Sequence, residues 1–148
     1  MPEVIKIGIT EKNNQKIQEV QTVKLIANQG IVGDRHFKEF NDPFNQLSLI
    51  ESENIDNYNI KYGLNIPYID FRRNIITKGI QLNDLVGKKL KIGSSKVEAM
   101  DLCRPCRHLN ESLNQDNVLK EFLRKGGLRC QILNSSNINI GDKIQVLD

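Results

Sequence analysis

The sequence predicts a mostly β (α+β) fold, a closed or nearly closed barrel of short strands with a few inserted helices. Short strand-like stretches recur along the chain, glycine turns separate them, and only two segments have helical spacing. Strands and helices do not alternate in βαβ order, which argues against a doubly wound parallel sheet. No repeat or linker divides the 148 residues, so we expect a single domain over residues 1–148.

Strand patterns start close to the N-terminus. Val4–Thr10 alternates apolar and polar residues, and Val20–Ala27 is a second candidate. Gly30–His36 has too many glycine and polar residues for a regular element and predicts a shaped loop. Phe71–Thr77 is rich in β-forming residues and stops before Gly79. We therefore expect three strands in this half of the chain.

Further strands are predicted in the second half. Lys88–Ile92 and Lys96–Met100 flank a glycine and two serines, which is the pattern of a β-hairpin. Leu128–Leu133 returns to a strand pattern. So does Asn137–Leu147, which we expect to turn at Gly141.

Two helices are predicted between these strands. Ser48 stands three residues before Glu51, the spacing of a capping box, and predicts a helix through about Lys61 that stops at Gly63. Asp116–Lys125 places apolar residues at helical spacing before two glycines, so it predicts the second helix.

The composition excludes several classes of partner. The 21 basic and 18 acidic residues are mixed along the chain, which argues against nucleic-acid binding and fits a small anionic ligand. No stretch is apolar enough to span a membrane, and the N-terminus has no signal-peptide pattern. Three cysteines, an odd number, indicate free thiols in a reducing compartment. We therefore expect a cytoplasmic protein with no nucleic-acid or membrane partner.

The segment Cys-Arg-Pro-Cys-Arg-His at residues 103–108 carries the strongest chemical signal. Cysteine acts as a nucleophile and metal ligand in its thiolate form. Arg104 and Arg107 would stabilise a thiolate on Cys103 or Cys106 and could hold an anionic ligand beside it. The segment is therefore a candidate reactive centre.

Three other interpretations of the two cysteines stay open. A structural zinc site needs four ligands, and His36, His108 and Cys130 would have to complete it. A redox dithiol normally opens a helix in a βαβ unit, whereas Pro105 lies inside this pair. Two half-buried, unreactive thiols are the third interpretation. Cys130 itself has the pattern of a core residue in a strand.

Basic residues recur at two other places. Gly33 precedes Asp34, Arg35 and His36, and a second segment reads Arg72-Arg73-Asn74. Adjacent side chains of a strand point to opposite faces, so only one of the paired arginines should face a pocket. Any one of these arginines, taken alone, would be interpreted as a solvated surface charge.

Taken in order, these segments resemble the MOSC family, the stand-alone relatives of the C-terminal domain of molybdenum cofactor sulfurase. The resemblance runs from near residue 30 to the C-terminus. Its matching stretches are Gly30–His36, Gln46–Ile50, Arg72–Thr77, Leu82–Gly87, Leu102–Cys106, Gly126–Arg129 and Ile140–Asp142.

The resemblance implies a mostly β, barrel-like fold and a role with the molybdenum cofactor, a pterin dithiolene with a terminal phosphate, or with sulfur destined for it. In the related amidoxime-reducing enzymes a cysteine of this motif binds molybdenum, and Cys106 corresponds to it. A thiolate is a soft ligand that suits such a metal. Cys106 is therefore the predicted metal ligand and a predicted catalytic residue.

Further roles follow from the same resemblance. Arginine forks suit phosphate oxygens, amide and hydroxyl groups suit the pterin edge, and a histidine can supply a proton near neutral pH. The predicted phosphate ligands are Arg35, Arg73, Arg107 and Arg129, with Arg72 as the alternate; Asn74 and Thr77 would contact the pterin, and His36 or His108 would be the proton donor.

The reaction implied is reductive removal of a nitrogen-bound oxygen from a small N-hydroxylated base or amidoxime. The chain has no flavin, haem or iron–sulfur signature, so electrons would come from a separate flavodoxin- or ferredoxin-type reductase. No pyridoxal phosphate site is expected, because the desulfurase domain with its lysine has no counterpart.

Three other functions remain open on the sequence. Cys106 could carry persulfide sulfur from a separate cysteine desulfurase to a metal cofactor. The chain could instead bind or transfer the cofactor without turnover. A zinc-stabilised structural domain would require Cys103, Cys106 and Cys130 together.

Overall fold

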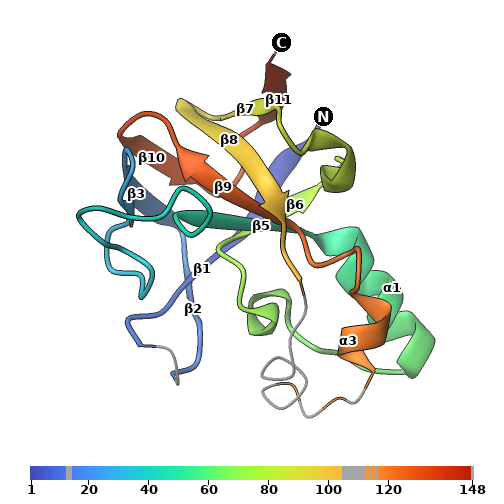
Figure 1. The fold of residues 1–148 in the computed structure, drawn as a ribbon. Coiled ribbons are helices and arrows are strands. Elements are labelled where there is room, and N and C mark those ends of the chain that lie inside the picture. The colour runs from blue at the N-terminus through green and yellow to red at the C-terminus, as the bar shows by residue number, and fades with distance from the viewer. Residues whose placement is uncertain (13–14, 105–112, 114, 116, 148) are drawn as a thin grey trace.

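The computed structural model describes residues 1–12, 15–104, 113, 115 and 117–147. Eleven strands and two helices are named in this part of the chain (Figure 1). The helices are α1 (Ser52–Tyr62) and α3 (Val118–Glu121). The strands are β1 (Glu3–Ile9), β2 (Gln18–Val20), β3 (Thr22–Ile26), β4 (Gly30–Ile31), β5 (Leu47–Glu51), β6 (Ile75–Lys78), β7 (Lys89–Ile92), β8 (Ser95–Leu102), β9 (Leu128–Ile132), β10 (Ser136–Asn139) and β11 (Ile144–Leu147).

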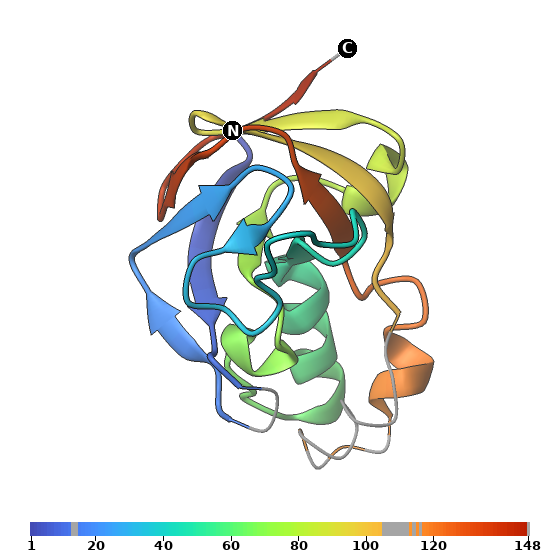
Figure 2. The same ribbon diagram turned by 60° about the vertical axis from the view of Figure 1, so that its left-hand side comes forward.

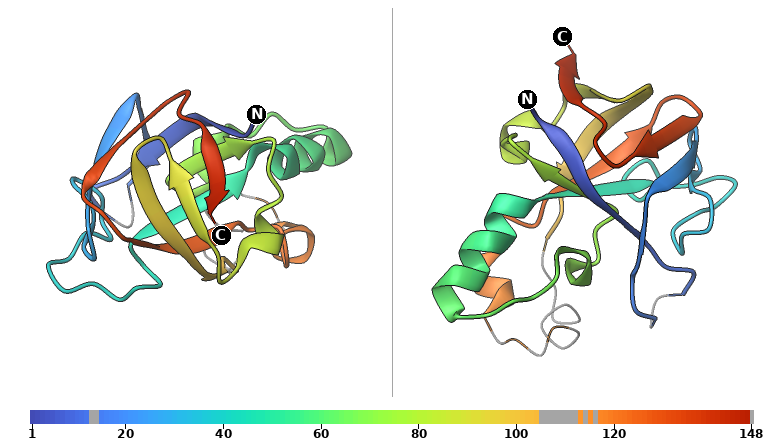
Figure 3. Two further views of the ribbon diagram at one scale, coloured as in Figure 1. Left: turned by 90° about the horizontal axis from the view of Figure 1, so that it is seen from above. Right: turned by 180° about the vertical axis from the view of Figure 1, so that it is seen from behind.

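Eight of these strands form one strongly curled sheet in the order β11-β7-β8-β9-β5-β6-β1-β2 (Figure 3). A second sheet has the order β10-β3-β4. The Val4 N–H donates to Asp142 O at 2.9 Å and the Gly141 N–H donates to Val4 O at 2.8 Å, so the start of β1 meets the turn before β11. The predicted mostly β, barrel-like architecture is confirmed.

One pairing differs from the rest of the large sheet. β5 and β6 run parallel, with Leu49 opposite Ile75, while the other pairings between its named strands are antiparallel. α1 makes the crossover between β5 and β6, so these three elements form a βαβ unit, which the sequence pattern did not indicate. Within the described residues no helix has the length and apolarity needed to cross a bilayer.

The core lies in two parts. The first consists of buried aliphatic side chains from both sheets, such as Leu25, Leu49 and Leu90. The second is partly aromatic and includes residues of α1 and α3, the two helices that lie in the lower half of the view in Figure 2. There the Phe122 ring lies 5.0 Å from the Phe71 ring and 5.4 Å from the Tyr58 ring, measured between centroids. This packing attaches α3 to α1.

The predicted capping box of the first helix is wrong. Ser48 lies within β5, and α1 begins only at Ser52. Glu51 is the extended residue before the helix and makes no side-chain capping hydrogen bond. The Ser48 hydroxyl instead exchanges hydrogen bonds with Asn74, so tertiary contacts override the local pattern. The predicted stop is confirmed, because Gly63 adopts the left-handed conformation (φ 63°) that ends α1.

The predicted strand over residues 71–77 is also shorter than expected. Phe71 ends a 3₁₀ turn that starts at Tyr68, and Arg72 follows in the left-handed conformation with φ 66°. β6 therefore begins only at Ile75. The predicted strand over residues 20–27 is divided at Gln21: its first residue ends β2, and the rest contains the whole of β3.

The second predicted helix is reduced to one turn. α3 ends at Glu121, and its described buried residues, Val118 and Phe122, are four apart. Leu123, which the helical pattern placed on the apolar face with Phe122, is instead 67% exposed. The hairpin of β7 and β8 and the strands β9, β10 and β11 agree with the predicted segments.

Candidate active-site pocket

A cavity of about 460 Å³ opens at the end of the curled sheet, beside the loop that joins β4 to β5. Five arginines and one histidine line it, and within the described part of the chain no carboxylate does. Such a wall favours an anionic ligand. The lining residues are Arg35, His36, Phe44, Asn45, Leu47, Ser48, Arg72, Arg73, Asn74, Leu102, Cys103, Arg104 and Arg129.

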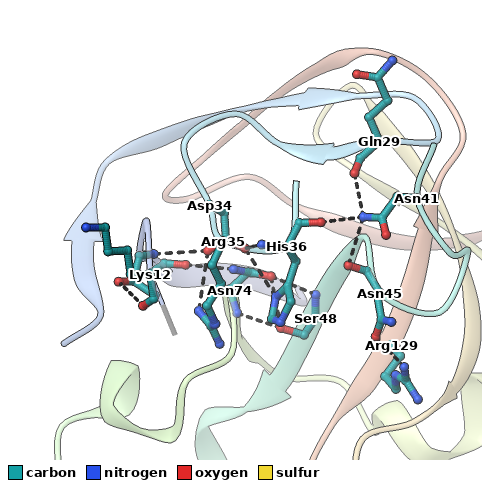
Figure 4. A network of polar contacts seen from close by, with 12 residues as sticks. Lys12, Gln29, Asp34, Arg35, His36, Asn41, Asn45, Ser48, Asn74 and Arg129 are labelled. Atoms are coloured by element: carbon teal, nitrogen blue, oxygen red, sulfur yellow. Dashed lines mark hydrogen bonds and ion pairs between the residues drawn. The ribbon is translucent and has the colours of Figure 1, made fainter. Parts of the chain in front are cut away.

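The turn at residues 33–36 is held against the end of β1. Asp34 accepts a hydrogen bond from the Thr10 N–H at 3.1 Å, and the Arg35 N–H donates to Thr10 O at 2.6 Å. The His36 N–H donates to the second oxygen of Asp34 at 3.3 Å. Figure 4 shows the resulting arrangement, in which the buried carboxylate lies between Arg35 and His36. The shaped loop predicted here is confirmed, with the two residues of β4 at its start.

The Asp34 carboxylate is ionised in this environment. Burial tends to raise its pKa, but the hydrogen bond from His36, the Thr10 N–H and the charge of Arg35 together lower it below the ordinary value. Asp34 therefore places a buried negative charge behind the arginine wall.

Arg35 contributes a charge that its neighbours do not fully satisfy. Its side chain is only 10% exposed, and Nη1 lies 3.7 Å from Asp34 Oδ1. This buried Nη1 has no hydrogen-bond partner among the described residues. Burial lowers the pKa of Arg35, Asp34 raises it, and the nearby charges of Arg72 and Arg73 lower it further. A buried donor beside like charges is an expected contact for an anion.

Arg72 and Arg73 both line the pocket, so the prediction that only one of them would face it is wrong. That prediction assumed strand geometry, whereas Arg72 is left-handed and the alternation of faces does not apply. The Arg72 guanidinium donates to Gln15 O at 2.9 Å, and burial lowers its pKa. Arg73 donates from Nε to Gly126 O at 3.0 Å. The two side chains thus reach the cavity while contacting different loops.

The side chains of Asn74 and Thr77 form hydrogen bonds that hold neighbouring strands together. The Asn74 side chain lines the pocket, but its Oδ1 accepts from the Ser48 N–H and hydroxyl and its Nδ2 donates to Gly8 O at 3.1 Å. It thereby joins β1, β5 and the start of β6. Thr77 is fully buried, its hydroxyl donates to Ile50 O at 3.4 Å, and it does not line the pocket. The structure therefore does not bring Thr77 to the predicted pterin edge.

Arg129 and Asn41 order the loop between β4 and β5. Arg129, on β9, donates from Nε to Phe44 O at 2.8 Å, contacts Asn45 and lies 5.8 Å from the centre of the Phe44 ring. Asn41 donates from Nδ2 to Gln29 O and to the His36 carbonyl at 2.7 and 2.6 Å (Figure 4). The loop wall of the cavity is thus fixed at both ends.

Cys103 lies in the wall at the end of β8. Its N–H donates to Gly127 O at 2.7 Å, and a Cβ on Gly126 would lie 2.6 Å from Cys103 O. Glycine at 126 therefore permits the close approach of this backbone. Burial raises the pKa of the Cys103 thiol despite the nearby Arg73 and Arg129, so it stays protonated at neutral pH.

The remaining sequence-predicted groups fall into two sets. Cys106, Arg107 and His108 lie outside the described residues. Cys130 is fully buried in β9, as predicted for a core residue, and burial raises the pKa of its thiol. Among the residues that the structure describes, no three His, Cys, Asp or Glu side chains gather as metal ligands.

Several lining residues were not singled out from the sequence. Phe44 and Asn45 reach the cavity because the loop folds back onto β9, and Leu47 reaches it from the first position of β5; no local pattern indicates these contacts. Arg104, predicted from the sequence to stabilise a thiolate and hold an anion beside it, does line the cavity, whereas the sequence indicates Asp34 only as part of a glycine turn. Their roles depend on tertiary contacts.

The fold and the sequence agree on a family. Residues 33–145 match the MOSC domain family. The structure of YuaD from Bacillus subtilis is similar over 99% of this chain and 96% of its own, with a TM-score of 0.84 and 18% identity. YiiM from Geobacillus stearothermophilus matches with a TM-score of 0.82 and 16% identity, over 100% of this chain and 76% of its own.

YiiM from Escherichia coli is similar as well, with a TM-score of 0.75 and 15% identity, over 100% of this chain and 70% of its own. At these identities the solved structures show the fold alone. No curated protein matches the sequence. The match of the family over most of the chain, on the fold that these structures share, shows that the chain belongs to the MOSC domain family.

Proposed function

We propose that this chain binds the molybdenum cofactor in the arginine-lined pocket and uses it to reduce N-hydroxylated compounds. The MOSC family is associated with binding of this cofactor. The observation that carries the proposal is the cluster of five lining arginines, one of them with a buried Nη1 that lacks a hydrogen-bond partner in the described structure. A phosphate group would supply an oxygen acceptor for the buried Nη1 of Arg35 and negative charge for the other guanidinium groups.

The residues present fit the cofactor at two chemically different ends. Arg35, Arg72, Arg73 and Arg129 would hold the terminal phosphate. Phe44, Leu47 and Leu102 add apolar wall against which a flat ring system can pack. The thiolate of Cys106 would be the soft ligand for the metal, as the family resemblance implies. Asn74 keeps the arginine segment in place, because its side chain already bonds to Ser48 and Gly8.

When bound, the cofactor supplies a centre that exchanges two electrons with a substrate. The balanced reaction converts R–NH–OH, two electrons and two protons into R–NH₂ and water, and it breaks the N–O bond. A separate flavodoxin- or ferredoxin-type reductase would supply the electrons. His36 lines the pocket and would give one of the two protons to the departing oxygen.

The test is elemental analysis of protein purified from a host that makes the cofactor. We expect near one molybdenum atom per chain, and its loss in Cys106→Ser. The matched control is Cys130→Ala, which removes a thiol from the core rather than from the pocket and should keep the metal. The loaded protein should then reduce a hydroxylamine or an amidoxime with a chemical electron donor.

Other results would redirect the assignment. Zinc in place of molybdenum would support a structural metal site. A persulfide on Cys106 with no molybdenum would support a sulfur carrier that works with a cysteine desulfurase. Molybdenum in the protein without reduction of any N-hydroxylated compound would leave a cofactor-binding module and overturn the reductase.

A further inference from the structure

Asp34 and His36 form a pair that the proposed reaction can use. The imidazole Nδ1 of His36 lies 3.5 Å from Asp34 Oδ2, and the same oxygen accepts the His36 backbone N–H at 3.3 Å. The His36 side chain is 46% exposed and lines the cavity, whereas the Asp34 side chain is only 1% exposed. A fixed carboxylate therefore faces Nδ1 of a ring that is partly exposed and lines the cavity, and Figure 4 shows the two side chains next to each other.

The carboxylate also has little freedom to move away from the ring. The Thr10 N–H at the end of β1 holds its other oxygen at 3.1 Å, and Arg35 Nη1 lies 3.7 Å from that oxygen. An ionised carboxylate accepts hydrogen bonds and donates none, so the nitrogen that faces it is favoured as N–H. In a neutral imidazole only one nitrogen carries a proton, so a hydrogen bond that fixes N–H at Nδ1 leaves Nε2 unprotonated.

We propose that Asp34 is a positioning residue that fixes neutral His36 as the Nδ1–H tautomer, so that Nε2 receives a proton from solvent and passes it to the substrate. The tautomer stands on the geometry alone, while the proton transfer rests on the proposed function. In that step Nε2 gives its proton to the hydroxyl oxygen as the N–O bond breaks, and water leaves. Two electrons come from the external reductase, and solvent supplies the second proton.

The first test requires neither cofactor nor activity. The ¹⁵N chemical shifts of the imidazole in cofactor-free protein distinguish the two tautomers. We expect Nδ1–H for His36 in the native protein and loss of that preference in Asp34→Asn, whose amide no longer demands a donor. The matched control, Asp56→Asn, changes an exposed carboxylate on α1 that bonds to Tyr68 and should leave the His36 spectrum unchanged. An Nε2–H tautomer in the native protein would overturn the proposal, even if Asp34→Asn fails to fold.

The second test addresses catalysis with the loaded protein. Orienting partners of functional histidines typically contribute about 10- to 100-fold, so we expect Asp34→Asn to lower kcat by about tenfold at unchanged molybdenum content. Because Asp34 acts through His36, the double variant with His36→Gln should be no slower than His36→Gln alone. Additive losses would reject the relay. A protein that shows the Nδ1–H tautomer but reduces no N-hydroxylated compound would instead contradict the proposed reaction and leave the tautomer assignment standing.

Discussion

Arg35 places a positive charge inside the pocket wall, and only part of that charge is balanced. The Asp34 carboxylate lies 3.7 Å from its Nη1, yet Arg72 and Arg73 act on the same guanidinium with the same sign of charge. Keeping like charges together in a partly buried space is unfavourable unless an anion joins them. The arrangement is therefore pre-organised for an anionic ligand, which the proposed function identifies as the cofactor phosphate.

Replacing Arg35 with glutamine should weaken phosphate binding. A hydrogen bond to a charged group contributes about 1.5–3 kcal/mol, which corresponds to roughly a tenfold or greater rise in Kd. Calorimetric titration with inorganic phosphate measures this change without any cofactor. Arg124→Gln is the matched control, because Arg124 is exposed and does not line the cavity. Equal affinity in native protein and Arg35→Gln would show that this guanidinium does not hold the anion.

The sequence could identify candidate site residues, but it could not show which groups those residues contact. Arg35, His36 and Arg129 do line the cavity, and it was the family resemblance, not the residue types alone, that marked them as candidate site residues. The polar side chain of Asn74 also lines the cavity, but its amide group already forms hydrogen bonds with Ser48 and Gly8 inside the fold. A sequence gives the donors and acceptors of a side chain and not the strands that will satisfy them.

Gly127, the residue before β9, explains how the strands that form the pocket wall are brought together. Gly127 has φ +98°, and a Cβ there would overlap the carbonyl oxygen of Leu49 on β5. Its own carbonyl accepts the Cys103 N–H at 2.7 Å. Close backbone contact at this point therefore links β5, β9 and the end of β8, from which Cys103 and Arg104 reach the cavity.

Gly127→Ala should destabilise the protein far more than Gly63→Ala. Both positions have positive φ, but nothing lies within 4 Å of a Cβ on Gly63. The left-handed conformation alone costs about 1–2 kcal/mol, and forced overpacking adds about 1–3 kcal/mol at residue 127. Urea unfolding of the two variants compares them directly. A similar loss of stability in both would mean that the contact with β5 relaxes freely.

The short helix α3 depends on the aromatic cluster. Phe122 is 1% exposed and contacts Tyr58 and Phe71, whereas the adjacent Leu123 is 67% exposed. Phe122→Ala should therefore lower the free energy of unfolding by about 3–5 kcal/mol, while Leu123→Ala should change it by about 0.5 kcal/mol or less. Thermal and urea unfolding of this neighbouring pair provide the measurement. Comparable effects would contradict the packing of α3 through Phe122.

Local sequence patterns predicted the positions of most strands. They failed where tertiary contacts determine the backbone conformation. The hairpin of β7 and β8 follows from alternation around a glycine turn, which needs no distant partner. Residues 72–74 have β-forming neighbours, but Arg72 turns left-handed and Asn74 bonds to Gly8 and Ser48. That departure from strand geometry is what lets two adjacent arginines face one pocket.

The barrel-like class could be predicted because many short strands with few helices have few stable arrangements. The strand order could not be predicted. Alternation shows which face of a strand is buried, and it does not name the neighbouring strand. The parallel pairing of β5 with β6 through α1 therefore emerges only from the structure.

The buried carboxylate of Asp34 and the partly buried carboxylate of Glu51 should affect the pH dependence of folding in opposite directions. Burial, with Glu53 and Asp84 nearby, raises the pKa of Glu51 above its ordinary value although the Leu82 N–H opposes the shift. The hydrogen bonds and the charge around Asp34 outweigh burial there and lower its pKa. Above the ordinary pKa of Asp, about 3.9, ionised Asp34 therefore stabilises the folded protein, and this contribution is lost as the pH falls through its lowered pKa.

Glu51 should show the opposite sign, because an acid whose pKa is raised by folding destabilises the folded state once the unfolded chain ionises. The penalty is absent well below the ordinary pKa of about 4.3, develops as the pH rises towards the folded pKa, and stays at neutral pH. Glu51→Gln keeps an oxygen for the Leu82 N–H and removes the charge, so it should raise Tm at about pH 7 and have little effect at about pH 3. Asp34→Asn should lower Tm at neutral pH and have a smaller effect in acid. Thermal unfolding across this range tests both, and a Glu51→Gln gain that persists in acid would show that the buried charge is not its cause.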